Sequence, residues 1–160
     1  MALVIAASQS AACEGVITEA AQAFVEPRTL AAIRSAKAQF GDPEQFEKIA
    51  KWHSEKASWV LDAWTEVWLS PEFLSWDLEQ HLGKVTWPVL AIHGDSDEFG
   101  SVEFPRRITN KVKGPSDLAL LNHCGHVPHR EKREEVLRLS HLFLESVPSI
   151  RSGTAVRPHR

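Results

Sequence analysis

The sequence predicts an α/β fold with about three parallel strands and a helical insertion after the first of them. Short apolar runs alternate with amphipathic stretches, and a long tryptophan-rich segment separates the first run from the second. The chain has 160 residues, of which 43% are hydrophobic, so it is long enough to bury an apolar core. We therefore expect one domain over residues 1–147, with residues 26–82 as the helical insertion and residues 148–160 as a disordered tail.

The first half of the chain predicts one strand and several helices. Ala2–Ala7 is a continuous apolar run, which is typical of a strand buried on both faces of a parallel sheet. Apolar residues then recur at helical spacing over residues 28–40, until Gly-Asp-Pro at 41–43 ends the helix. Helical structure is predicted again over residues 46–70, followed by shorter turns over residues 73–82.

The second half of the chain predicts two more strands, each followed by a helix. Residues 88–92 (Pro-Val-Leu-Ala-Ile) and residues 118–121 are the predicted strands. Residues 102–112 are amphipathic and follow Ser101, a candidate N-cap, and residues 131–147 form the last predicted helix. Strands that alternate with helices in this way predict a parallel sheet.

Aromatic residues gather in the helical insertion, where five of the six tryptophans lie between Trp52 and Trp76. Packing inside the insertion is the simplest role for these side chains. The alternative is that they line a pocket for an apolar or aromatic small molecule. The candidate substrate-binding residues are Trp59, Trp64, Trp68 and Phe99.

Composition excludes several classes of protein. The formal net charge is -3 and no continuous basic stripe occurs, which argues against a nucleic-acid partner. No apolar run is long enough to span a bilayer, so no membrane partner is expected. The two cysteines form no disulfide framework, and residues 1–12 lack the charged start of a signal peptide. We predict a cytoplasmic protein.

Polar residues of the types that take part in catalysis follow two of the predicted strands. Residues 93–100 (His-Gly-Asp-Ser-Asp-Glu-Phe-Gly) follow the second strand, and residues 122–129 (Asn-His-Cys-Gly-His-Val-Pro-His) follow the third. The carboxyl ends of parallel strands meet at one edge of the sheet, so an acid and a histidine from these loops can meet there. The carboxylate would then accept the Nδ1 proton of the imidazole and leave Nε2 free as a base.

These two loops resemble those of α/β-hydrolases. Trp87-Pro-Val-Leu-Ala-Ile-His-Gly-Asp-Ser-Asp is similar to the strand and loop that carry the triad acid, and Asn122-His-Cys-Gly-His-Val-Pro-His is similar to the histidine loop. The resemblance covers about residues 2–147 and implies the C-terminal part of such an enzyme, with the tryptophan-rich segment as its cap. It also implies that Asp97 is the catalytic acid and His126 the catalytic base.

Each of these residues has a simpler alternative role. The alternative role for Asp97 is that of a turn carboxylate that caps the next helix. The alternative role for His126 is that of a hydrogen-bonded loop histidine. Asp95 is more typical of a solvated turn residue than of a triad acid, and we expect His93 to support the loop through backbone hydrogen bonds.

Metal binding is the other interpretation of the histidine loop, because three histidines and Cys124 lie between residues 123 and 129. Structural zinc sites need four ligands and catalytic zinc sites a recognisable arrangement, whereas Gly125 and Pro128 favour a turn over a ligand-bearing helix. We therefore predict no metal and no cofactor. Cys124 is also not favoured as a nucleophile, because nothing after it marks an oxyanion site.

The nucleophile that the resemblance implies is missing from the sequence. Enzymes of this family carry it in a Gly-x-Ser-x-Gly turn, and none of the eight glycines here forms that pattern. We therefore expect a hydrolase for a small-molecule ester or similar bond that is inactive alone and is completed by an N-terminal complementary chain or by self-association. The alternatives are a non-catalytic module that binds a small apolar ligand or a complementary chain, and a substitute nucleophile such as Ser8.

Overall fold

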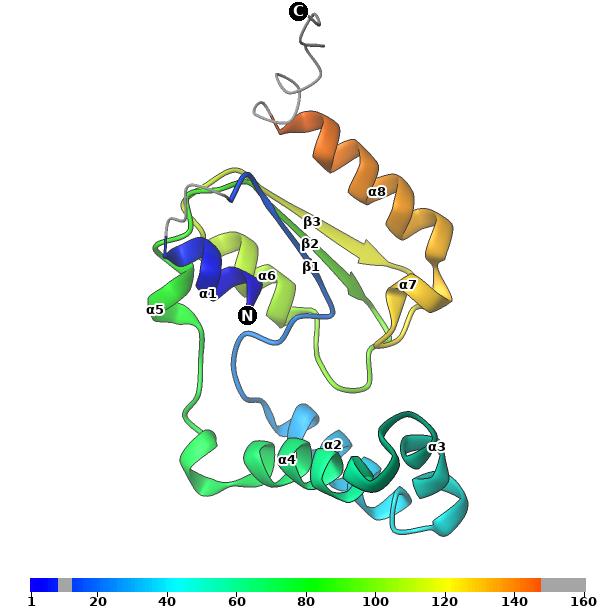
Figure 1. Cartoon of the computed structure of the whole chain (residues 1–160). Helices are drawn as coiled ribbons and strands as arrows, with labels where there is room; N and C mark the ends of the chain where they lie inside the picture. The colour runs from blue at the N-terminus through cyan, green and yellow to red at the C-terminus, as the bar shows by residue number, and fades with distance from the viewer. Residues whose placement is uncertain (9–12, 148–160) are drawn as a thin grey trace, which may run out of the picture. The chain divides into compact units, whose positions relative to one another are not determined.

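The computed structural model describes residues 1–8 and 13–147, and the predicted tail at residues 148–160 lies outside this part of the chain. Its sheet has three parallel strands in the order β1 (Val16–Glu19), β2 (Val89–Gly94) and β3 (Ser116–Leu121) (Figure 1). The predicted α/β fold with a sheet of three parallel strands is therefore confirmed.

The predicted first strand is wrong, because Ala2–Ala7 forms a helix, α1, and the first strand is β1. The buried residues of α1 are Leu3, Ala6 and Ala7, at the i, i+3 and i+4 spacing of one helix face. Alanine also favours the helix over the strand, and a run of six apolar residues has no alternation with which to distinguish the two. Ser8 consequently ends a helix, and its hydroxyl donates a hydrogen bond to the Ile5 carbonyl at 2.6 Å.

The central strand β2 positions the rest of the sheet. All six of its residues are buried, and Val89 pairs with Val16 of β1 on one side and with Ser116 of β3 on the other. Helices α1 and α6 (Glu103–Lys111) cover one face of the sheet, and α8 (Arg133–Ser146) covers the other (Figure 1). Because side chains alternate along a strand, successive residues of β2 contact the two helical layers in turn.

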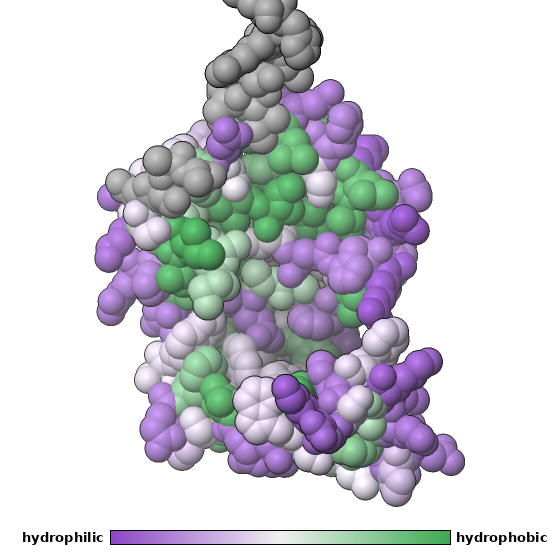
Figure 2. Space-filling view, in the orientation of Figure 1, coloured by the Kyte–Doolittle hydropathy of each residue, from purple (hydrophilic) through white to green (hydrophobic). Residues whose placement is uncertain are grey.

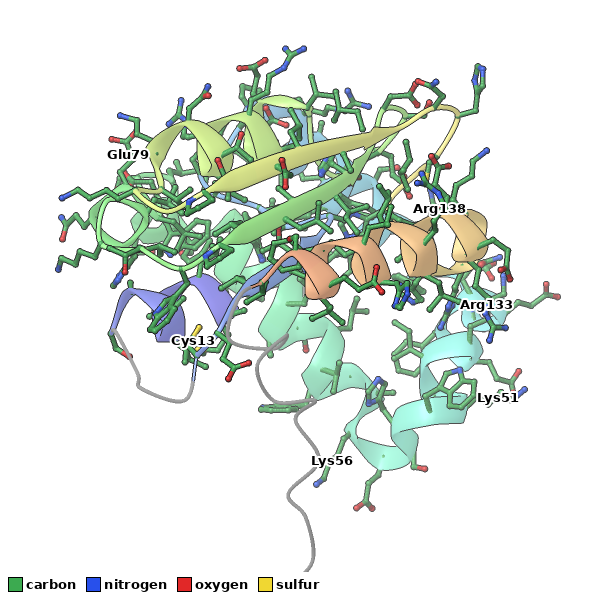
Figure 3. All side chains as sticks on the ribbon, turned by 90° about the horizontal axis from the view of Figure 1, so that it is seen from above. Cys13, Lys51, Lys56, Glu79, Arg133 and Arg138 are labelled. Carbon is green, nitrogen blue, oxygen red and sulfur yellow. The ribbon has the colours of Figure 1, made fainter. Side chains whose placement is uncertain are left out.

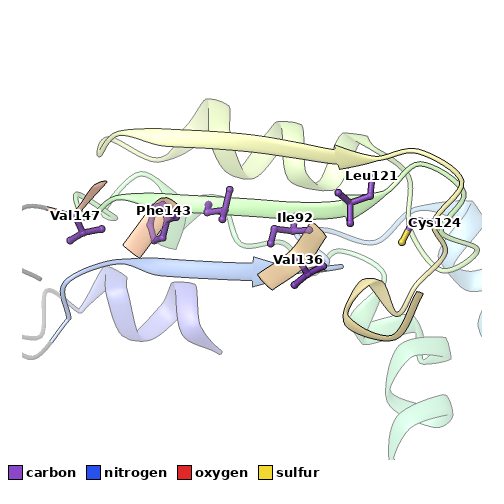
Figure 4. Close-up of a cluster of buried hydrophobic side chains, with 7 residues drawn as sticks. Ile92, Leu121, Cys124, Val136, Phe143 and Val147 are labelled. Carbon is purple, nitrogen blue, oxygen red and sulfur yellow. The ribbon is translucent and has the colours of Figure 1, made fainter. Parts of the chain in front are cut away.

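A cluster of apolar side chains joins α8 to the sheet (Figure 4). Leu90 and Ile92 of β2 contribute to it, and Phe143 of α8 contacts this face of the sheet. The other buried members are Leu121, Cys124, Val136 and Val147. On the opposite face, Phe104 and Ile108 of α6 are fully buried. Apolar burial on both faces therefore holds the ends of β2 and β3 in place.

Polar contacts fix the ends of α6. The N-cap of α6 is Val102 and not Ser101 as predicted, although the Ser101 hydroxyl accepts a hydrogen bond from the backbone N–H of Glu103 at 3.3 Å. At the other end, Glu79 of the short helix α5 (Glu79–Leu82) lies beside α6 (Figure 3). Its carboxylate lies 3.5 Å from Arg107 and 3.7 Å from Lys111.

Residues 24–77, together with residues 98–100, form a second compact unit, which is helical. Its elements are α2 (Pro27–Gln39), α3 (Pro43–His53), the 3-10 turn η1 (Ser54–Lys56), α4 (Ala57–Leu69) and the 3-10 turn η2 (Pro71–Phe73). The helix predicted over residues 46–70 is interrupted at Ser54, whose φ of 50° lies in the left-handed region. No helix in residues 1–8 and 13–147 is long and apolar enough to cross a membrane.

Candidate active site

The acid loop follows β2 and is tied by its backbone to the histidine loop that follows β3. The N–H of Asp95 donates to the carbonyl of Leu121 at 3.0 Å, and the N–H of Ser96 donates to the carbonyl of Cys124 at 2.9 Å. Asp97, the next residue, is buried, with 1% of its surface exposed. A buried carboxylate requires polar partners, because its desolvation is otherwise costly.

His126 supplies such a partner for Asp97. Its Nδ1 lies 2.9 Å from Oδ2 and 3.0 Å from Oδ1 of Asp97, although 29 residues separate the two in sequence. A carboxylate can only accept a hydrogen bond, so Nδ1 carries the proton and Nε2 of the neutral ring is left unprotonated. The His126 side chain is 35% exposed. The arrangement therefore presents an oriented imidazole base backed by a buried acid.

A second imidazole lies next to the same carboxylate. Nε2 of His93 is 3.5 Å from Oδ2 of Asp97, and the His93 side chain is 1% exposed. His93 belongs to β2 itself, where it points to the face opposite Ile92. This contact with the Asp97 side chain comes in addition to the backbone hydrogen bonds through which His93 is predicted to support the loop.

Gly94, the last residue of β2, allows the two loops to approach each other. A Cβ atom at this position would lie 2.2 Å from the Cys124 carbonyl oxygen and 2.3 Å from that of Gly125. These distances are far below van der Waals contact, and both atoms belong to the backbone. Only glycine can therefore occupy this position while the histidine loop stays against the end of β2.

Two exposed carboxylates accept hydrogen bonds from the backbone of the histidine loop. Glu131, at the end of the short helix α7 (Pro128–Glu131), accepts from the N–H of Gly125 at 2.8 Å and from that of Val127 at 3.1 Å. These two bonds hold the pKa of Glu131 below its ordinary value. The Ser96 hydroxyl, with smaller contributions from the backbone of Cys124 and His123, likewise lowers the pKa of Asp95.

The lowered pKa of Glu131 predicts an acid-induced loosening of the histidine loop. A carboxyl group with a lower pKa in the folded state stabilises that state fully above its ordinary pKa of about 4.3, and loses this effect as the pH falls through the lower value. We expect the backbone amide NMR signals of Gly125 and Val127 to shift together in a titration, with a midpoint below about 4.3. The Glu131→Gln variant should abolish this shift, and a midpoint at or above the ordinary value would contradict the account.

A further carboxylate links β1 to the last residue of the histidine loop. Glu19, the last residue of β1, accepts a hydrogen bond from the backbone N–H of His129 at 3.2 Å and also contacts Nδ1 of its ring. Cys124, within the loop, is fully buried, and burial raises the pKa of its thiol. This environment disfavours the thiolate that a nucleophile requires. Residues 1–8 and 13–147 contain no cluster of side chains that could hold a metal ion.

The four candidate substrate-binding residues all lie in the second unit. The rings of Trp64 and Phe99 are 5.9 Å apart, and the Phe99 carbonyl accepts a hydrogen bond from the Thr29 hydroxyl at 2.6 Å. Trp68 instead contacts Phe73 and Trp76. Trp59 is 70% exposed.

Comparison with known proteins shows the fold. No protein-family model and no curated protein matches the sequence. Three solved structures are similar to the chain over 89% to 91% of its length: a bacterial membrane phospholipase A (20% identity, TM-score 0.69), the serine hydrolase CarC involved in carbazole degradation (20%, 0.64), and an α/β hydrolase from a Medee basin deep-sea metagenome library (14%, 0.62). The chain covers 53%, 58% and 61% of these three proteins, respectively. It therefore has the fold of a large part of an α/β-hydrolase.

Sequence reasoning did not identify the residues that hold the histidine loop. Glu131 was expected only to begin the last helix, and neither Glu19 nor Gly94 was singled out. The predicted strand ends at residue 92, which leaves Gly94 in the loop that follows, so the close approach of another backbone that a glycine inside a strand marks was not evident from the sequence.

Proposed function

We propose that this chain supplies the acid and the base of a Ser-Asp-His hydrolytic triad that acts on an ester or similar bond of a small molecule. The hydrogen bond between Nδ1 of His126 and the buried carboxylate of Asp97 is the observation that carries this proposal. Asp97 fixes the tautomer and stabilises the imidazolium that forms, and Nε2 of His126 takes the proton from the attacking hydroxyl group. The neighbouring structures, which include a phospholipase and a serine hydrolase, support this class of reaction by analogy of fold.

The nucleophile in this proposal lies outside the 160 residues, because the sequence contains no Gly-x-Ser-x-Gly turn. The edge of β1 that faces away from β2 is the proposed docking site for the segment that carries it. Val16 and Ala20 donate their N–H groups to Pro88 and Ile92 of the β2 side, so the backbone groups of Ile17 point to the opposite edge. Within residues 1–8 and 13–147, no strand pairs with that edge.

Apolar surface accompanies this edge. A groove of about 370 Å³ lies along it, lined by Ala2, Ile5, Cys13, Glu14, Gly15, Val16 and Ile17. Ile5 of α1 is 53% exposed there. Figure 2 shows hydrophobic side chains on α1, on α8 and over β1 between them. An unpaired strand edge flanked by apolar surface is suited to accept a further strand from a complementary segment or chain.

Labelling with a fluorophosphonate, which reacts with activated serines, tests this function. The 160-residue chain should not be labelled, whereas protein expressed together with its upstream coding sequence should be. In that longer protein, His126→Ala should slow labelling by about 10³-fold or more, because triad members act as a unit.

Each part of the proposal can fail separately in this experiment. Labelling of the 160-residue chain would show that the nucleophile lies within it. Absence of labelling in the longer protein would contradict the hydrolase proposal and favour the alternative of a non-catalytic binding module.

A further inference from the structure

Glu131 holds the backbone on both sides of His126. One carboxylate oxygen accepts from the N–H of Gly125 at 2.8 Å, and the other accepts from the N–H of Val127 at 3.1 Å. The two donors are the residues immediately before and after His126. A bidentate acceptor of this kind restrains the peptide group between Cys124 and Gly125 and the one between His126 and Val127, and therefore the course of the backbone through His126.

The part of the histidine loop at Cys124 is restrained by contacts with the acid loop. The carbonyl of Cys124 accepts from the N–H of Ser96, and the N–H of Cys124 lies 3.5 Å from the Asp95 carboxylate. Beyond Cys124, Glu131 supplies side-chain contacts to the backbone N–H groups of Gly125 and Val127. The two bonds to Glu131 therefore lie on either side of the residue whose ring contacts Asp97.

We propose that Glu131 is a positioning residue that keeps Nδ1 of His126 within hydrogen-bonding distance of the buried Asp97 carboxylate. This inference rests on the proposed acid–base role of the pair. The contact with Val127, the N-cap of α7, also closes the start of that helix, but a helix-terminal role does not account for the shorter contact with Gly125, which lies two residues before the N-cap. Electrostatics does not explain the placement either, since the Asp97 charge repels that of Glu131. The hydrogen bonds themselves hold the carboxylate there.

The Nδ1 proton of His126 gives a direct test, because a proton shared with a carboxylate exchanges slowly with water and has a distinct NMR signal. Glu131→Ala removes both acceptor oxygens. Because hydrogen bonds to a charged group are among the stronger ones, we expect exchange of this proton to be about tenfold faster in this variant. Glu131→Gln keeps one acceptor oxygen and should give an intermediate rate. The milder variant keeps the test usable if the alanine variant folds poorly.

Glu134→Ala is the matched control. Glu134 is an exposed glutamate in the first turn of α8 and has no hydrogen-bond partner among the described residues. Its replacement should leave the exchange rate unchanged. Unchanged rates in both Glu131 variants, with the signal present in the wild type, would overturn the positioning role and leave the acid–base pair intact. Absence of the signal from the wild type would contradict the acid–base pair itself, and the positioning role with it.

Discussion

Replacement of Gly94 by alanine is expected to lower the free energy of unfolding by about 3 kcal/mol, the upper part of the range for added volume in a packed interior. The new methyl group would lie 2.2 Å from one backbone carbonyl oxygen and 2.3 Å from another, at Cys124 and Gly125. Backbone atoms cannot rotate away as a flexible side chain can. The histidine loop must therefore move as a whole, and His126 should lose its contact with Asp97.

Urea unfolding of the wild type and of Gly94→Ala measures this effect. Gly83→Ala is the control, because a Cβ atom at position 83 would meet nothing nearer than the Glu79 carbonyl at 3.9 Å. The control should change stability by less than about 0.5 kcal/mol. Equal stabilities for the Gly94 and Gly83 variants would mean that the histidine loop does not press against the end of β2 as described.

Under the proposed function, Asp97→Asn is expected to reduce the rate of hydrolysis by the longer protein, which includes the segment with the nucleophile, about 10⁴-fold. Little change in fold is expected. The introduced amide has the shape of the carboxylate but can donate a hydrogen bond to Nδ1. This favours the tautomer that carries the proton on Nε2, so the ring can no longer act as a base. The rate loss arises from the wrong tautomer and does not require the loop to move.

Asp95→Asn is the matched control for this variant. Asp95 is an exposed turn residue two positions earlier, and the amide would retain an oxygen that accepts from the Ser96 hydroxyl. We expect its rate to stay within about tenfold of the wild type, as for the loss of one weak surface contact. A loss of equal size in both variants would contradict the assignment of Asp97 as the acid.

The ends of β2 and β3 could be predicted from sequence because local signals agreed there. Each strand is a short run of apolar residues bounded by turn-forming residues, and each is followed by an amphipathic helix. The topological rule for parallel sheets then predicts that Asp97 and His126 lie at the same edge. The distance between their side chains agrees with that expectation.

The first strand could not be predicted in the same way. Ala2–Ala7 is more apolar than Val16–Glu19, yet α1 forms at the former because alanine favours a helix and the buried residues share one helix face. The short β1 is stabilised by pairing with the distant β2, a tertiary effect with little local signal. The role of Glu131 also depends on how the chain folds back after residue 127, which spacing alone does not reveal.

The central claim is that Asp97 holds His126 as an oriented base, and the tautomer of the His126 ring tests it most directly. NMR of the ¹⁵N-labelled chain at neutral pH distinguishes the two ring nitrogens and shows which one carries the proton. We predict that Nδ1 is protonated and Nε2 is not in the wild type, and that Asp97→Asn reverses this. A wild-type ring protonated on Nε2, or the same tautomer in both proteins, would contradict the claim.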